Sequence, residues 1–189
     1  MADLTQLPGD LPIPKDDGAC DHLKGMEIPD IMLRNAADEM VNVRHETRSW
    51  CVIYCYPMTG RPDVELPEGW EQIPGARGCT PQTCEFRDRV RHFHEASVKV
   101  VGLSTQSTAY QKEMVQRLCV PFPVLSDEKL RFTDALRLPT FSYGGEIFLR
   151  RLTLVCQGSK IIEVFYPVFP PSENANNVLK WIKANAVGK

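Results

Sequence analysis

The 189-residue sequence predicts an α/β layered fold in which a central mixed sheet is flanked by helices. Two observations lead to this prediction. Short apolar segments typical of buried strands alternate along the chain with longer segments that have the period of amphipathic helices. The series then ends in a hairpin followed by one more helix. A chain of this length forms one domain of ordinary size with a full core, and we expect an N-terminal arm over residues 1–24 and a folded domain over residues 25–189.

The first half of the chain is predicted to contain a hairpin, a buried strand, a long loop and a helix. Residues 50–56 form a continuous apolar run, as expected for a strand that is buried on both faces. The loop over residues 57–78 is rich in proline and glycine, and a loop of this length inside a domain is usually functional. The expected ranges are 31–34 and 40–44 for the hairpin strands, 50–56 for the buried strand and 81–96 for the helix.

The second half continues the alternation. Ser172 is expected to cap the final helix, which should extend to about Ala186. The other expected elements are a strand over 98–103, a helix over 108–118, a short strand over 124–125, a helix over 127–136, and a hairpin with strands over 147–155 and 160–166. This order of strands and helices matches a thioredoxin-like fold.

Composition and charge narrow the class of protein. The apolar fraction of 43% and the charged fraction of 24% are those of a soluble globular protein. The net charge of -2 gives no general attraction to nucleic acid or to an anionic membrane, and no apolar run reaches the roughly 18 residues of a membrane span. The N-terminal residues lack the basic and apolar regions of a secretory signal. The seven cysteines are odd in number and irregularly spaced, which favours a reducing compartment, and we expect a cytoplasmic protein.

Two cysteines, Cys79 and Cys84, lie where the long loop becomes a helix, in the segment Gly-Cys-Thr-Pro-Gln-Thr-Cys-Glu-Phe-Arg-Asp over residues 78–88. The unpaired N–H groups at a helix start carry partial positive charge and favour an anion, so the first cysteine is expected to form a reactive thiolate. A second thiol within reach can then close a disulfide with it.

The spacing of the two cysteines allows two different starts of this helix. Thr80 is a good N-cap and Pro81 is favoured at the first helical position, and with this later start the two thiols can meet. If the helix starts at Cys79 instead, the pair lies about 140° apart around the axis with a rise of about 7.5 Å, which disulfide geometry does not allow. We therefore expect the early start in the reduced form and the later start in the disulfide form.

The motif Gly-Cys-Thr-x-x-x-Cys-x-Phe-Arg-Asp closely resembles the active-site signature of peroxiredoxins of the peroxiredoxin Q class, also called bacterioferritin comigratory proteins. Four further segments resemble this family and follow one another in its order, so that the resemblance covers roughly residues 25–183. These segments are residues 50–57, 100–104, 123–127 and 151–155.

The resemblance implies a thiol peroxidase that reduces hydrogen peroxide and organic hydroperoxides. It implies that Cys79 attacks the peroxide and becomes a sulfenic acid, that Cys84 resolves this acid as an intramolecular disulfide, and that Arg151 holds the thiolate and polarises the peroxide. An external thioredoxin-like dithiol would reduce the disulfide, and no metal, flavin or haem cofactor is needed. The chain is expected to be a monomer or a weak homodimer.

The pair Arg150 and Arg151 supports this assignment independently. Neighbouring side chains of a strand point to opposite faces, so one of the two arginines is expected to face inward. A buried arginine normally needs an anion to pair with, and a thiolate would serve.

One departure from the family pattern concerns the loop. Pro57 precedes Cys79 by 22 residues, much further than the family pattern places it, which implies an insertion of about 15 residues, roughly residues 59–75. The position three before Cys79, where the family carries a peroxide-binding threonine, is Ala76. That role could fall to Thr59, supplied from before the insertion, or be replaced.

Other interpretations stay open from the sequence alone. The pair could serve a thiol–disulfide oxidoreductase or a redox sensor on the same fold without peroxidase turnover, or the chain could be a non-catalytic interaction domain. A zinc site is disfavoured because Cys79, Cys84, His92 and His94 lack the usual ligand spacing. The remaining cysteines are interpreted as core packing (Cys51 and Cys55, which share a strand face) or as structural or surface thiols (Cys20, Cys119 and Cys156).

Overall fold

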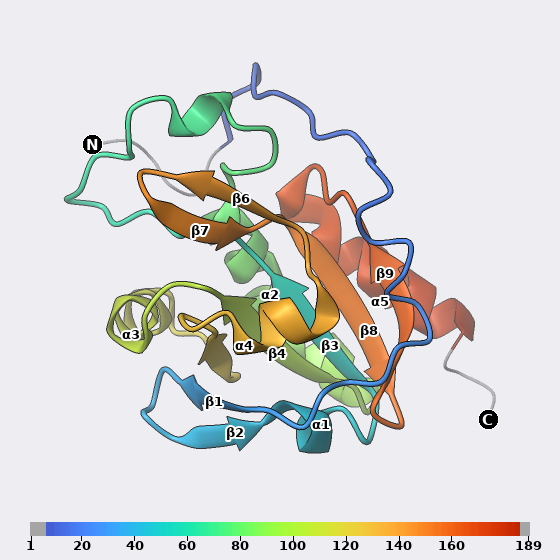
Figure 1. Ribbon diagram of the computed structural model, residues 1–189. Helices are drawn as coiled ribbons and strands as arrows, with labels where there is room; N and C mark the ends of the chain where they lie inside the picture. Colours follow the sequence, from blue (N-terminus) through green and yellow to red (C-terminus); the bar gives the residue numbers. More distant parts are fainter. Residues whose placement is uncertain (1–6, 186–189) are drawn as a thin grey trace.

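A seven-stranded mixed sheet lies at the centre of the computed structural model, which describes residues 7–185 (Figure 1). From one edge to the other, the strands are β2 (Met40–Asn42), β1 (Met32–Asn35), β5 (Val124–Ser126), β4 (Lys99–Ser104), β3 (Cys51–Cys55), β8 (Leu152–Gln157) and β9 (Lys160–Phe165). The strand β3 runs parallel to β4 and antiparallel to β8. The predicted fold, a central mixed sheet flanked by helices, is confirmed.

The remaining elements surround this sheet. A separate hairpin pairs β6 (Thr140–Tyr143) with β7 (Glu146–Leu149). The helices are α1 (Val43–Glu46), α2 (Cys79–Glu95), α3 (Thr108–Leu118), α4 (Arg131–Leu136) and α5 (Asn174–Asn185), and two short 3-10 turns are η1 (Trp70–Gln72) and η2 (Pro171–Glu173). None of the helices within residues 7–185 is long and apolar enough to span a membrane.

The central strand β3 divides the core into two faces because its side chains alternate. Cys51 and Cys55 point into one apolar cluster, whereas Tyr54 and Tyr56 point into the other. The second cluster also contains Phe86 of α2 and several residues of α5, so these two helices cover the same face of the sheet. The reactive thiol proposed from the sequence therefore belongs to the α2–α5 side of the core.

The interpretation of the other cysteines is consistent with their burial. Cys51 and Cys55 share one face of the strand and are fully buried, which confirms that they pack in the core. Cys20 and Cys156 lie in the same apolar cluster, and Cys119 is exposed at the end of α3. All seven cysteines of the chain carry free thiols.

The predicted single strand over residues 147–155 is wrong, because the chain breaks at Arg150 and Arg151. The residues before this point belong to β7, and those after it belong to β8 of the central sheet. The backbone N–H of Arg150 donates to the carbonyl of Pro139 (2.8 Å), next to the start of the β6–β7 hairpin. This contact ends the hairpin and turns the chain toward the core.

The predicted helix over residues 127–136 begins later than expected, at Arg131. The carboxylate of Asp127 accepts hydrogen bonds from the backbone N–H groups of Phe132 (3.1 Å) and Thr133 (2.8 Å). Asp127 therefore satisfies the free donors at the start of α4 from a preceding turn rather than forming the helix itself.

The final helix also begins later than expected. Ser172 lies in the 3-10 turn η2, and α5 begins at Asn174. The expected end of this helix near Ala186 and residues 1–6 of the expected arm lie outside the described residues.

The helix predicted over residues 81–96 also has a different start, because α2 begins at Cys79 rather than at Pro81.

Candidate active site

Cys79 is the first residue of α2, with only 2% of its surface exposed. The residue before it, Gly78, caps the helix with a φ of 106°, a conformation that glycine adopts without strain. A side chain here would also collide, because a Cβ atom would lie 2.4 Å from Cγ of Pro171. This tight connection places the thiol at the positive end of the helix.

Arg151 brings a positive charge to this thiol from the start of β8. Its Nη2 atom lies 3.1 Å from Sγ of Cys79 and also donates to the carbonyls of Gly75 (3.1 Å), Ala76 (3.3 Å) and Arg77 (3.2 Å). The guanidinium therefore fixes the loop before α2 and contacts the thiol at the same time. A guanidinium at this distance can stabilise negative charge that develops at the sulfur during a reaction.

Only one of the two neighbouring arginines enters the site. Arg151 is 3% exposed, whereas Arg150 is half-buried and lies outside the core. The prediction that one of them faces inward is confirmed.

A chain of buried hydrogen bonds, which the sequence analysis missed, continues from Arg151 to the start of α5. Its Nη1 atom donates to Oε1 of Gln82, and Nε2 of Gln82 donates to Oδ1 of Asn174 (2.9 Å). The same Asn174 oxygen accepts a hydrogen bond from the hydroxyl of Thr153 (2.7 Å). Gln82 follows Cys79 by one helical turn, a spacing that could have indicated a shared face. Asn174 and Thr153 carry no local signal of this kind.

Cys84 lies five residues further along α2 and is half-buried. Because α2 begins at Cys79, the two side chains are separated around the helix axis as expected for the early start, and both thiols are free. Burial raises the pKa of the Cys84 thiol, and the nearby Arg87 guanidinium opposes this rise. The structure thus has the form expected for the reduced protein, and the form with the later start stays a prediction.

Thr59 is fully buried, but its polar groups face α3. Its backbone N–H and its hydroxyl lie 3.1 Å and 3.5 Å from Oε1 of Gln106. Among residues 7–185, Thr59 makes no hydrogen bond to Cys79. Within this range, the Cys79 thiol contacts Arg151 and the carbonyl oxygen of Ala76. This oxygen lies 3.6 Å from Sγ.

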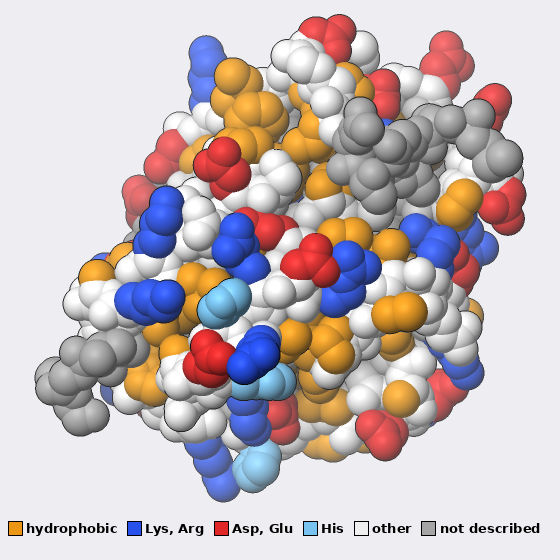
Figure 2. Space-filling model, turned by 180° about the vertical axis from the view of Figure 1, so that it is seen from behind, with side chains coloured by type: hydrophobic (Ala, Val, Ile, Leu, Met, Phe, Trp, Pro, Cys, Tyr) orange, Lys and Arg blue, Asp and Glu red, His pale blue; other side chains and the backbone are white. Residues whose placement is uncertain are grey.

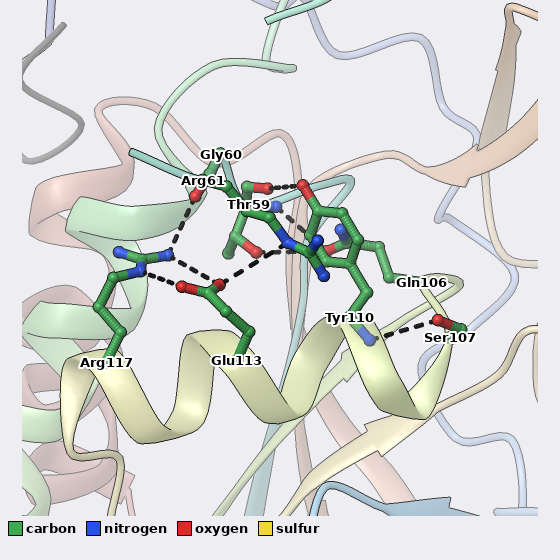
Figure 3. A network of polar contacts seen from close by, with 8 residues as sticks. All are labelled: Thr59, Gly60, Arg61, Gln106, Ser107, Tyr110, Glu113 and Arg117. Carbon is green, nitrogen blue, oxygen red and sulfur yellow. Dashed lines mark hydrogen bonds and ion pairs between the residues drawn. The ribbon is translucent and has the colours of Figure 1, made fainter. Parts of the chain in front are cut away.

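The beginning of the insertion, residues 59–75, is clamped to α3 (Figure 3). The hydroxyl of Tyr110 donates to the carbonyl of Thr59 (2.8 Å), and Arg117 donates to the carbonyl of Gly60 (3.0 Å). The guanidinium of Arg61 lies 4.0 Å above the ring of Tyr110. Charge–aromatic contact and carbonyl hydrogen bonds therefore hold the loop where it leaves the sheet.

The middle and the end of the insertion are fixed as well. Trp70 is buried against Phe141, Tyr143 and Phe148 of the β6–β7 hairpin, with ring centroids 5.0 to 5.7 Å apart. The end of the insertion is held by Arg151 at the carbonyl of Gly75 (3.1 Å). The insertion is thus packed against the domain at three points along its length.

The insertion, α3 and the β6–β7 hairpin surround an open cavity of about 770 Å³. Most of its surface is apolar and includes Leu66, Ile147 and Phe148. The charged residues of its lining are Arg61, Glu65, Glu128 and Glu146. Phe148 packs in one apolar cluster with Ala76, whose carbonyl contacts the Cys79 thiol. Phe148 therefore belongs both to the cavity wall and to the apolar cluster that contains Ala76 of the thiol loop. No group of three or more His, Cys, Asp or Glu side chains within residues 7–185 is arranged to hold a metal ion.

Comparison with known proteins matches this architecture to one family. The family model described as Redoxin matches residues 23–179. The chain belongs to the redoxin family. Among curated relatives of this redoxin, the chloroplastic peroxiredoxin Q of Arabidopsis thaliana is 26% identical over 162 residues, which cover 85% of this chain and 67% of the relative.

Solved structures show the same fold. Peroxidoxin BcpB from Mycobacterium tuberculosis superposes with a TM-score of 0.71 at 22% identity, covering 87% of this redoxin and 99% of that chain. A cysteine-to-serine mutant of PrxQ from Xylella fastidiosa gives a TM-score of 0.71 at 21% identity, with coverage of 87% and 98%. The bacterioferritin comigratory protein of Xanthomonas campestris, whose structure was described with its alkyl peroxide reduction activity, gives 0.67 at 19% identity, with coverage of 94% and 99%. The resemblance to the peroxiredoxin Q class and the thioredoxin-like fold are confirmed.

Proposed function

We propose how this thiol-dependent peroxidase works at the level of its residues. Cys79 is the peroxidatic cysteine, Cys84 is the resolving cysteine and Arg151 stabilises the reacting sulfur and the leaving oxygen. One observation carries this assignment: Nη2 of the buried Arg151 lies 3.1 Å from Sγ of Cys79, at the positive end of α2.

In the first step, the Cys79 thiolate attacks one oxygen of the peroxide and the O–O bond breaks. The sulfur becomes a sulfenic acid, and the other oxygen leaves as water or an alcohol after it takes up a proton. Negative charge develops on this leaving oxygen, and the Arg151 guanidinium is already in place to stabilise it.

In the second step, the Cys84 sulfur attacks the sulfenic acid, a disulfide forms and water leaves. The early helix start separates the two thiols, so the first turn of α2 unwinds before they meet. An external thioredoxin-like dithiol then reduces the disulfide by thiol–disulfide exchange, which returns both thiols and oxidises the dithiol. No metal or organic cofactor takes part, because sulfur carries both electrons.

The substrates are hydrogen peroxide and organic hydroperoxides. The cavity beside the insertion supports the second class, because its mostly apolar wall suits the organic group of such a peroxide and includes Phe148, which shares an apolar cluster with Ala76 of the thiol loop. The insertion thereby gains a role in substrate binding.

The protein works in the cytoplasm as a monomer or weak homodimer, without binding nucleic acid or membranes. The odd number and irregular spacing of the seven cysteines support a reducing compartment. On the face shown in Figure 2, hydrophobic side chains are interspersed with basic and acidic ones, which supports a monomer or a weak homodimer over a tight one. The net charge of -2 supports the absence of nucleic acid binding.

Peroxide consumption coupled to a thioredoxin system tests the proposal. The wild type should turn over, Cys79→Ser should be inactive, and Cys84→Ser should react once and stop as a sulfenic acid that a small thiol rescues. Turnover by Cys79→Ser, or loss of the first step in Cys84→Ser, would reverse the assignment. Dithiol–disulfide exchange without peroxide consumption would instead identify a redox sensor or oxidoreductase.

A further inference from the structure

Asn174, the first residue of α5, joins three elements of the structure by its side-chain oxygen. This oxygen accepts one hydrogen bond from Nε2 of Gln82 in α2 (2.9 Å) and one from the hydroxyl of Thr153 in β8 (2.7 Å). Asn174 is 3% exposed, and both of its partners are fully buried. Hydrogen bonds in such an environment fix orientation strongly, because a lost partner leaves a buried polar group unsatisfied.

We propose that Asn174 is a positioning residue with opposite effects on the two half-reactions. It orients Gln82 toward Arg151 and thereby speeds the attack on peroxide. Its hydrogen bond to Gln82 also stabilises the first turn of α2 and thereby slows disulfide formation. This inference rests on the proposed peroxidase function of Cys79 and Cys84.

The effect on the peroxide step follows from the direction of the hydrogen bonds. Gln82 and Thr153 both donate to the same atom of Asn174, its side-chain oxygen. Gln82 therefore turns its nitrogen toward Asn174 and its own oxygen toward Nη1 of Arg151. In the reverse orientation, the Gln82 amide nitrogen would face a guanidinium that also only donates.

Gln82 in turn selects which guanidinium nitrogen reaches the thiol. Nη1 of Arg151 is engaged by Gln82, which leaves Nη2 for Cys79 and for the carbonyls of the preceding loop. If Gln82 is free to rotate, Arg151 loses its only side-chain oxygen acceptor among the described hydrogen bonds. The guanidinium then no longer has one fixed orientation beside the sulfur.

The effect on disulfide formation follows from where the contacts to α5 lie along α2. Moving the helix start to near Pro81 changes the backbone hydrogen bonds of the segment from Cys79 to about Thr83, and Gln82 lies inside it. Glu85 lies just beyond Cys84, and its carboxylate accepts hydrogen bonds from the backbone N–H groups of Ala175 (2.8 Å) and Asn176 (3.2 Å). Two contacts to the start of α5 thus flank Cys84, and only the one from Gln82 to Asn174 lies in the segment that rearranges.

Rapid mixing of the full-length protein with hydrogen peroxide separates the two steps, with sulfenic acid trapping for the first and disulfide formation for the second. In Asn174→Leu, we expect peroxide attack to slow about 10-fold and disulfide formation to accelerate by a similar factor. The accelerated second step should also lower the fraction of Cys79 that is overoxidised to sulfinic acid at high peroxide.

Three further variants make the test specific. Asn174→Asp keeps an oxygen acceptor and should restore both rates toward the wild type. Thr153→Val preserves the shape of the side chain but removes one donor to Asn174. It should change both rates in the same directions by smaller factors. This variant keeps the inference testable if Asn174→Leu does not fold. Asn177→Leu replaces an exposed asparagine of the same helix and should change neither rate.

The inference would be overturned if both rates fall together in Asn174→Leu and Thr153→Val, or if both rates stay unchanged in these variants. It would also be overturned if Asn174→Asp does not restore the rates. These results differ from a failure of the proposed function, which would appear as a wild-type protein that does not consume peroxide through Cys79.

Discussion

Arg151 and Cys79 are 72 residues apart in the sequence, yet Nη2 of the arginine lies 3.1 Å from Sγ of the cysteine. The guanidinium is buried, and its other hydrogen bonds go to Gln82 and to three backbone carbonyls of the loop before α2. All of these partners are neutral. The thiol is therefore the group in this environment that can supply a compensating negative charge when it ionises.

Replacement of Arg151 should slow peroxide attack selectively. We expect Arg151→Ala to reduce the rate constant by about 100-fold, the loss typical of a removed transition-state donor. Arg151→Lys should recover little of it, because an ammonium group cannot reach the thiol, Gln82 and three carbonyls at once. Arg150→Ala is the matched control and should react almost as fast as the wild type. Single-turnover stopped-flow kinetics measures these rates, and similar small losses in both alanine variants would remove Arg151 from the site.

Disulfide formation should depend on pH through Cys84. Burial raises the pKa of this thiol, so the reactive thiolate is a minor form at neutral pH and its fraction grows as the pH increases. The rate of disulfide formation after one equivalent of peroxide should still be rising at about pH 9, since the ordinary thiol pKa is about 8.5. A plateau well below that pH would show that Cys84 reacts with an ordinary or lowered pKa.

Arg87 provides a charge test of the same step. Its guanidinium opposes the rise in the Cys84 pKa, so Arg87→Gln should raise that pKa further and slow disulfide formation at neutral pH severalfold. Arg91→Gln removes an equal charge from an exposed position of α2 and serves as the control. If both variants slow the step equally, the effect comes from overall charge and not from proximity to Cys84.

Oxidation should move the start of α2 from Cys79 to near Pro81. In the reduced form, the N–H of Gln82 donates to the carbonyl of Gly78 (3.1 Å), and this bond should be lost in the disulfide. Amide hydrogen exchange should then increase at Gln82 and Thr83 but not beyond Glu85, since Phe86 and Phe93 anchor the helix in the core. Unchanged exchange in a protein with a verified Cys79–Cys84 disulfide would contradict the switch.

A charge added to the apolar part of the cavity wall should affect organic peroxides only. Ile147 lines the cavity and is 42% exposed, so Ile147→Glu should fold normally. We expect about a 10-fold lower kcat/KM for cumene hydroperoxide and an unchanged value for hydrogen peroxide. Met40→Glu, at a similarly exposed apolar position on the edge strand β2, is the control. Equal losses for both peroxides in Ile147→Glu would exclude a substrate role of the cavity.

The sequence predicted the elements whose determinants are local. The helix α3 occupies the predicted residues 108–118, because Ser107 caps its start and its apolar positions repeat with the helical period. The strand β3 was recognisable as an unbroken apolar run. The break between β7 and β8 could not be recognised from the sequence, because apolar residues continue on both sides of Arg150 and Arg151. The break depends on a contact with Pro139, which the sequence does not reveal.

The residues of the candidate site also fall into those that local sequence indicated and those that it did not. The motif around Cys79 and Cys84 is contiguous, and the adjacent arginines indicated that one of them must face inward. The hydrogen bonds from Gln82 to Asn174 and from Asn174 to Thr153 join segments that are distant in the sequence and leave no pattern in it. The three-point packing of the insertion was hidden for the same reason, since its aromatic partners lie in the later β6–β7 hairpin.

The partners of the thiol loop have a consequence for the order in which the protein is made. Arg151 contacts Cys79, the Pro171 ring packs where Gly78 lacks a side chain, and Asn174 holds Gln82. All three lie far downstream of the thiol, so a chain still on the ribosome exposes Cys79 long before these partners have been synthesised. The nascent polypeptide therefore carries the cysteine without its guanidinium, and the reactive centre is assembled only after Asn174 has been synthesised.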